Sequence, residues 1–141
     1  MSRIQLALNV DDLDEAVTFY SKLFGAEPAK RHPGYANFAI TEPPLKLVLM
    51  ENAGAGGTLN HLGVEVPTTD EVSAAVRRLD SEGVDTKTEE GVNCCYAVQD
   101  KVWVNDPDGA AWEIYAVLED AEQLTRDGCD CAGRELATAC C

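Results

Sequence analysis

Residues 4–25, IQLALNVDDLDEAVTFYSKLFG, recur in altered form 56 positions later as residues 60–81, NHLGVEVPTTDEVSAAVRRLDS. In both copies an alternation of apolar and polar residues, typical of a strand, leads into the wider spacing of an amphipathic helix. Identical residues occupy these equivalent positions: Leu6 and Leu62, Val10 and Val66, Asp14 and Asp70, Glu15 and Glu71, Leu23 and Leu79. A strand–helix unit that occurs twice predicts two related modules.

Both copies carry helix boundary signals and are followed by further extended runs. Asp11 or Asp12 can cap the first helix and Gly25 can end it, while Thr68 or Thr69 can cap the second. The apolar stripe of the first helix is expected to consist of Ala16, Phe19, Tyr20 and Leu23. The expected helices are 12–24 and 69–82, and the expected strands are 3–10, 35–41, 45–50, 60–66, 84–88, 96–105 and 110–117.

These elements predict an α+β fold in which two tandem βαβββ modules, about residues 3–50 and 60–118, form a metal-binding cup. The Gly/Ala-rich residues 51–58 link the modules, so that one domain covers residues 1–118. Residues 119–141 are short of large apolar groups and form a cysteine-containing tail. Between the last two expected strands the sequence Asn-Asp-Pro-Asp-Gly predicts a turn, because Pro presets the bend and Gly permits a positive φ.

Composition limits the class of partner. The net charge of −14 over 141 residues argues against nucleic acid and anionic membranes. No apolar run approaches the length of a membrane span, and the start, MSRIQLALNVDD, lacks the charged, apolar and small-residue order of a signal peptide. We therefore expect a cytoplasmic protein that acts on a small molecule, as a monomer or as a homodimer formed through exposed sheet edges.

Three residues form a candidate metal-ligand set. Gln5 and His61 occupy equivalent positions of the repeat, and Glu113 points to the opposite face from its neighbours on a later strand. One amide oxygen, one imidazole nitrogen and one carboxylate come close to the two-histidine, one-carboxylate triad of non-haem Fe(II) oxygenases. The set also accepts Mn(II), Ni(II) or Co(II). The other histidine, His32, stands before Pro33 in an expected loop and is assigned to the surface.

Six cysteines lie in the last third of the chain, and two of them are adjacent. Cys94 and Cys95 cannot readily form a disulfide with each other, because the small ring strains both the peptide and the S–S geometry. Two neighbouring thiols instead make a clamp for a soft, thiophilic centre, such as a metal or metalloid. The roles of the remaining cysteines stay open: Cys129, Cys131, Cys140 and Cys141.

The duplicated βαβββ units, the strand-borne set of Gln5, His61 and Glu113, and the ending NDPDG-xx-WEIY at 105–115 look like the vicinal oxygen chelate superfamily. That superfamily includes glyoxalase I, bleomycin- and fosfomycin-resistance proteins and extradiol dioxygenases. The resemblance covers about residues 3–118. Because the sequence Asn-Cys-Cys-Tyr precedes the strand that leads into NDPDG, the chain is most similar to the ArsI carbon–arsenic lyases and to related cadmium-induced proteins.

This resemblance implies an Fe(II)- and O2-dependent enzyme that cleaves the carbon–arsenic bond of trivalent organoarsenicals and releases inorganic As(III). Gln5, His61 and Glu113 would hold the metal and carry the catalysis, and Cys94 and Cys95 would bind the substrate. Tyr96 and Tyr115 either line the pocket or pack. Whether methyl or aromatic arsenicals are preferred, and which metal is native, stays open.

Two rival functions remain. The same metal set and thiols could sequester cadmium or arsenic without turnover, which would require no O2. A transferase of thiols or epoxides, as in glyoxalase or fosfomycin resistance, is the second rival. The adjacent cysteines Cys94 and Cys95 count against it, because those relatives usually lack such a pair.

Overall fold

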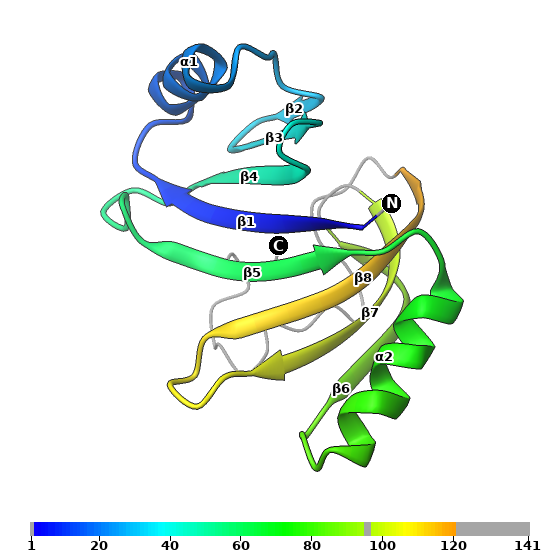
Figure 1. Ribbon diagram of the computed structural model, residues 1–141. Helices are drawn as coiled ribbons and strands as arrows, with labels where there is room; N and C mark the ends of the chain where they lie inside the picture. The colour runs from blue at the N-terminus through cyan, green and yellow to red at the C-terminus, as the bar shows by residue number, and fades with distance from the viewer. Residues whose placement is uncertain (1, 95–96, 121–141) are drawn as a thin grey trace. The chain divides into compact units, whose positions relative to one another are not determined.

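The computed structural model describes residues 2–94 and 97–120 (Figure 1). The chain divides into two compact units: the N-terminal unit, Arg3–Leu62, and the C-terminal unit, which runs from Gly63 onward and also includes Ser2. No helix in the described ranges is long and apolar enough to cross a membrane. In chain order the elements are β1 (Arg3–Val10), α1 (Leu13–Phe24), β2 (Lys30–His32), β3 (Tyr35–Ile40), β4 (Leu45–Glu51), β5 (Leu59–Glu65), α2 (Thr69–Ser81), β6 (Lys87–Cys94), β7 (Ala97–Asn105) and β8 (Ala111–Asp120).

The prediction of an α+β fold with two βαβββ modules is confirmed by this element order. Two details differ from the sequence-based expectation. A short additional strand, β2, is the fourth strand of the first module and contains His32, which was expected in a loop. The strand expected at 84–88 is instead β6, which begins later and runs through Cys94.

In the N-terminal unit the strand order is β2-β3-β4-β1-β5. β1 runs parallel to β4, whereas β3 pairs antiparallel with both β2 and β4. The apolar residues of β1, which alternate with its polar ones, pack with α1 into a core whose fully buried members include Leu13, Val17, Phe38, Leu47 and Leu49. Burial of each such side chain stabilises the fold by about 1.5–3 kcal/mol. The polar side chains of β1 therefore lie on the face of the strand that α1 does not cover.

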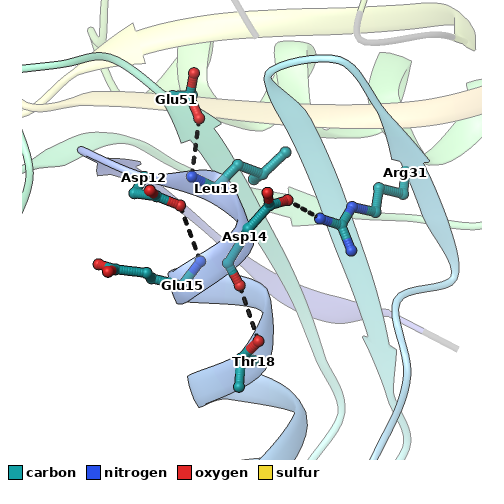
Figure 2. A network of polar contacts seen from close by, with 7 residues as sticks. All are labelled: Asp12, Leu13, Asp14, Glu15, Thr18, Arg31 and Glu51. Carbon is teal, nitrogen blue, oxygen red and sulfur yellow. Dashed lines mark hydrogen bonds and ion pairs between the residues drawn. The ribbon is translucent and has the colours of Figure 1, made fainter.

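The N-terminus of α1 is held by carboxylates (Figure 2). Asp12, the N-cap, accepts a hydrogen bond from the Glu15 backbone N–H at 3.0 Å, and Glu51 accepts one from the Leu13 N–H at 2.9 Å. Asp14 forms an ion pair with Arg31 of β2. The negative groups satisfy exposed N–H donors and complement the positive end of the helix dipole. At the other end Gly25 has φ 63°, so glycine suits this left-handed cap.

The expected apolar stripe of α1 was wrong in two positions. Phe19 and Leu23 are 57% and 58% exposed. The helix instead buries Leu13 and Val17, one turn apart, and continues that row toward Tyr20 and toward Phe24. A helix can bury only one stripe, and the row that begins at Leu13 faces the sheet.

In the C-terminal unit the strand order is β5-β8-β7-β6. β5 occurs in both orders because residues 59–62 belong to the N-terminal unit and residues 63–65 to the C-terminal unit. β7 pairs antiparallel with both β6 and β8. α2, capped by Thr68, packs against one face of these strands through Val72, which clusters with Val102 of β7 and Ala116 of β8. The opposite face of β7 and β8 is therefore free of α2 and presents the alternate residues of both strands.

The predicted turn at 105–109 joins β7 and β8. The Asp106 side chain accepts hydrogen bonds from the backbone N–H groups of Asp108 at 2.9 Å and Ala110 at 2.8 Å. Gly109 adopts φ 86°. The aspartate holds its own loop closed while glycine supplies the left-handed backbone, which fixes the register of the strand that carries Glu113.

Within the N-terminal unit, Asp11 holds the linker between the modules. One oxygen of this exposed carboxylate accepts hydrogen bonds from the backbone N–H groups of Gly54 at 2.8 Å and Gly56 at 2.9 Å. A Cβ atom added at Gly56 would lie 2.6 Å from the Asp11 carboxylate. A side chain at position 56 would therefore displace the Asp11 carboxylate.

We predict that Gly56→Ala lowers the free energy of unfolding by about 1–2 kcal/mol, because the methyl group displaces the carboxylate and breaks both hydrogen bonds. Urea unfolding of the metal-free protein measures this. Asp11→Ala is the matched control. The clash is absent in the double variant, so its loss of unfolding free energy should be smaller than the sum of the losses in the two single variants. Full additivity would contradict the proposed steric cause.

Candidate metal centre

Gln5 and His61, which the repeat predicts to be metal ligands, meet within the N-terminal unit. Gln5 lies on β1 and His61 on β5, and the residues are only 4% and 2% exposed. The Gln5 Nε2 atom lies 3.2 Å from the His61 Nε2 atom. At this distance the amide can donate a hydrogen bond to an unprotonated ring nitrogen. The structure brings these two residues together; their role as ligands stays a prediction.

The second ring nitrogen of His61 has a different partner. His61 Nδ1 lies 2.8 Å from the side-chain oxygen of Asn60, the preceding residue, which is 1% exposed. Histidines that bind metals through one nitrogen usually donate the hydrogen of the other to a fixed acceptor. Asn60 is in the position of that acceptor.

Glu113, the third predicted ligand, lies on β8 in the C-terminal unit. Its neighbour Ile114 packs in the cluster beneath α2, so Glu113 lies on the opposite face of the strand, as the alternation predicts. The residue is 2% exposed. Its carboxylate Oε2 atom is 2.8 Å from the Nζ atom of Lys101, whose side chain is fully buried. A buried carboxylate thus has a buried ammonium group as its partner.

Lys101 was not identified from the sequence. Besides the ion pair, its Nζ atom lies 5.4 Å from the centroid of the Trp103 ring and 5.9 Å from that of Tyr115. Both aromatic faces attract a cation at these distances. Tyr115 is itself fully buried, and its hydroxyl donates a hydrogen bond to Glu65 at 3.1 Å, so it packs within the unit.

Glu89 of β6 is a second buried carboxylate beside Lys101. Burial raises the pKa of the Glu89 carboxyl, because loss of water disfavours the charged form. The charges of Lys101 and Lys87 and a hydrogen bond from Trp103 act in the opposite direction and offset only part of the effect. The negative charge of Glu113 raises the same pKa further.

Of the two predicted substrate-binding cysteines, only Cys94 belongs to the described residues. Cys94 is the last residue of β6 and pairs with Ala97 of β7. Cys95 lies outside the described residues, as do Tyr96 and the tail cysteines Cys129, Cys131, Cys140 and Cys141. Within residues 2–94 and 97–120, no group of three or more His, Cys, Asp and Glu side chains is placed to hold a metal. The predicted set contains only one His and one Glu, so it depends on the Gln5 amide.

We predict that Lys101→Met lowers the free energy of unfolding of the metal-free protein by about 3–5 kcal/mol, because it leaves the Glu113 carboxylate buried without its counter-charge. Chemical denaturation measures the loss. Lys22→Met, an exposed lysine on α1, is the matched control and should change stability by less than about 0.5 kcal/mol. Equal effects of the two substitutions would show that the buried ion pair does not contribute.

Glu89→Gln is expected to raise the unfolding temperature of the metal-free protein at neutral pH. A raised pKa in the folded state means that the folded protein favours the neutral Glu89 carboxyl. The contribution of the neutral carboxyl to folding stability is complete below the ordinary pKa of 4.5, and it is lost as the pH rises through the pKa of the folded state. The permanently neutral amide avoids that loss. The difference from the unmodified protein should therefore shrink toward acid pH in thermal scans between about pH 4 and about pH 8. A difference that does not depend on pH would contradict this, and the exposed Glu90→Gln is the control.

The chain matches the family described as "Glyoxalase/Bleomycin resistance protein/Dioxygenase superfamily" over residues 3–114. It is 66% identical over 122 residues to the "Cadmium-induced protein CadI" of Mycobacterium tuberculosis, which covers 86% of this chain and 80% of that one. It is 56% identical over 142 aligned positions to the "Trivalent organoarsenical cleaving enzyme" of Thermomonospora curvata, covering 99% and 94% of the two chains.

Among solved structures, the Mn(II)-bound glyoxalase from Novosphingobium aromaticivorans superposes with a TM-score of 0.62 at 19% identity, over 90% of this chain and 43% of that one. A likeness at this level of identity concerns the fold. The family match and the close relatives agree with the motifs in the sequence. The chain belongs to the glyoxalase/bleomycin resistance protein/dioxygenase superfamily.

Proposed function

We propose that this protein cleaves the carbon–arsenic bond of trivalent organoarsenicals in a reaction that depends on Fe(II) and O2 and that releases inorganic As(III). The observation that carries the proposal is the relation to the Thermomonospora curvata protein, because it extends over nearly the whole of both chains at 56% identity. The described side chains add donor atoms of the right kind for a metal. The adjacent cysteines add a site for arsenic.

The donor set fits a divalent metal. Gln5, His61 and Glu113 offer an amide oxygen, an imidazole nitrogen and a carboxylate, and all three residues are buried. Held by these residues, Fe(II) would supply the activation of O2. Mn(II), Ni(II) or Co(II) suit the same donors, so the preference for Fe(II) is part of the proposal. Lys101 places a buried positive charge 2.8 Å from the Glu113 carboxylate, which offsets its negative charge.

The paired thiols bind and orient the substrate. An organoarsenical R–As(OH)2 carries two exchangeable hydroxyl groups and one carbon. Cys94 and Cys95 displace both hydroxyls, two water molecules leave, and arsenic remains attached to two sulfurs and to the carbon. Fixing two of the three bonds of arsenic restricts the direction of the As–C bond, which is a proximity effect.

The overall reaction balances with O2 as the oxidant. For a methyl group, CH3As(OH)2 and O2 give formaldehyde and As(OH)3. Arsenic stays trivalent, the carbon loses four electrons, and O2 takes them up as its two oxygen atoms enter the products. Formaldehyde and As(III) must therefore form in equal amounts. An aromatic arsenical is a substrate of the same class.

A second candidate function is sequestration of cadmium or arsenic without turnover. The 66% identity to the protein named for induction by cadmium favours it. A sequestering protein binds through the thiols, has no use for O2 and returns no product. The thiols would be kept reduced in the cytoplasm, where we expect the protein, under either function.

The test loads the protein with Fe(II) anaerobically, adds methylarsonous acid, and then admits air to half of the sample. We expect As(III) and formaldehyde to appear together, in equal amounts and only with both Fe(II) and O2. Chromatography with elemental detection measures As(III), and a colorimetric assay measures formaldehyde. Tight binding of the arsenical without release under either atmosphere would contradict the lyase and support sequestration.

Matched variants separate the two parts of the site. His61→Ala and Glu113→Ala should abolish Fe(II) binding and release of As(III) while the arsenical still binds. Cys94→Ser should lose release while Fe(II) still binds. The controls are His32→Ala, the only other histidine, and Glu119→Gln, an exposed carboxylate on the same strand as Glu113. Full activity of Cys94→Ser together with Cys95→Ser would contradict the role of the thiols.

A further inference from the structure

A chain of side-chain hydrogen bonds runs from His61 to the linker between the modules. His61 Nδ1 lies 2.8 Å from the Asn60 oxygen. The Asn60 amide nitrogen lies 3.0 Å from the Asn9 oxygen, and the Asn9 amide nitrogen lies 2.9 Å from the Thr58 hydroxyl. The Thr58 hydroxyl lies 2.6 Å from the backbone oxygen of Ala55. All of these residues belong to the N-terminal unit.

The direction of every hydrogen bond in this chain follows from its last member. A backbone carbonyl can only accept, and two oxygen atoms 2.6 Å apart repel unless a hydrogen lies between them, so the Thr58 hydroxyl donates to Ala55. Thr58 has a single hydrogen and must therefore accept from the Asn9 amide. Asn9 then presents its oxygen to Asn60, and Asn60 presents its own oxygen to His61.

The chain consequently determines which nitrogen of His61 carries the hydrogen. Because Asn60 offers an acceptor, Nδ1 must donate, and in the neutral ring Nε2 is left with its lone pair. Nε2 is the nitrogen 3.2 Å from the Gln5 amide. The other tautomer would place a lone pair against the Asn60 oxygen at 2.8 Å, which is unfavourable in a buried site.

The surrounding backbone makes the far end of the chain rigid. The Asn9 backbone N–H donates to the Thr58 carbonyl at 3.0 Å, and the Gly57 N–H donates to the Asn9 carbonyl at 3.3 Å. The side chains of Asn9 and Thr58 therefore meet across two backbone hydrogen bonds.

The module repeat indicates that the fold itself does not require this series of side-chain hydrogen bonds. Asn60 is equivalent to Ile4 in the first copy, and Asn9 is equivalent to Glu65 in the second. Ile4 is 44% exposed and precedes Gln5 as Asn60 precedes His61. The residue before a glutamine has no tautomer to control. Of the two equivalent positions, only the one followed by a histidine carries an asparagine.

We infer that Asn60 is a positioning residue that holds His61 in the tautomer whose Nε2 carries the lone pair, the form of the ring that can bind a divalent metal through Nε2. Asn9 and Thr58 fix the orientation of the Asn60 amide. This role rests on the proposed function, in which His61 binds the metal. Its direct consequence, the position of a hydrogen on His61, exists in the metal-free protein and can be measured there.

The experiment records the side-chain 15N chemical shifts of the two histidines in metal-free protein at about pH 8.5, where an ordinary imidazole is neutral. His61 is expected to carry its hydrogen on Nδ1, and His32 serves as the internal reference. A His61 ring without a hydrogen on Nδ1 would overturn the inference. In Asn60→Leu the preference for Nδ1 should be lost, and in Thr58→Val it should weaken.

Metal binding supplies the second readout. Anaerobic titration with Fe(II) should show an affinity about 10–100-fold lower for Asn60→Leu, the usual cost of losing the group that orients a metal-binding histidine. Asn60→Asp keeps an oxygen toward Nδ1 and should retain most of the affinity and the tautomer. Leu59→Ala, at the exposed neighbouring position, should bind Fe(II) as the unmodified protein does.

The outcomes distinguish this inference from the proposed function. Unchanged Fe(II) affinity and unchanged tautomer in Asn60→Leu would overturn the positioning role even if As(III) is released. Should Asn60→Leu fail to fold in thermal scans, the unmodified protein and Thr58→Val still decide the tautomer. A hydrogen on Nδ1 in a protein that binds Fe(II) but releases no As(III) would support the positioning role and contradict the lyase.

Discussion

The burial of polar side chains on the strands is the constraint on which the rest of the structure depends. Gln5, His61 and Glu113 are each less than 5% exposed, although an unpartnered polar group inside a protein costs several kcal/mol. Such positions are tolerated only when neighbouring groups supply hydrogen bonds or opposite charge. The identity of those neighbours therefore determines both stability and the chemical state of each donor atom.

The two units meet this constraint in different ways. The N-terminal unit surrounds His61 with neutral amides, and a chain of hydrogen bonds assigns each donor and acceptor without any net charge. The C-terminal unit pairs the Glu113 carboxylate with the Lys101 ammonium group, so two charges cancel within 2.8 Å. In a chain with a net charge of −14, a fully buried lysine is a specific counter-charge. Both solutions give a candidate metal ligand a fixed, buried partner.

Much of the fold could be predicted because it is encoded locally. The caps at Asp12 and Thr68, the glycine end of α1 and the Asp106 turn each depend on residues within a few positions of one another. The three-residue strand β2 and the late start of β6 were missed, because neither has a local apolar pattern. The exposed Phe19 shows the same limit, since the face of α1 that is buried depends on where the sheet lies.

The candidate site could be predicted only in part, for the same reason. The repeat offset places Gln5 against His61, and alternation places Glu113 on the face opposite Ile114. Lys101 was missed, although Lys101 and Trp103 alternate with valines along one strand, because pairing it with Glu113 requires the register between β7 and β8. The chain through Asn60 was missed because Asn9 and Asn60 are 51 residues apart and neither is unusual alone.

The energetic cost of the buried network bears on the choice between turnover and sequestration. A chelator for cadmium or arsenic needs thiolates, which bind soft ions tightly without help from amides or an oriented imidazole. It has no use for a buried Lys101–Glu113 pair or for a histidine whose tautomer is controlled through three other side chains. Catalysis at a metal requires that few ligands be held in one geometry and one protonation state, with positions left open for reactants. Burying the groups that restrict His61 and Glu113 in this way lowers the stability of the fold. A catalytic function would explain that cost, whereas sequestration of cadmium or arsenic would not.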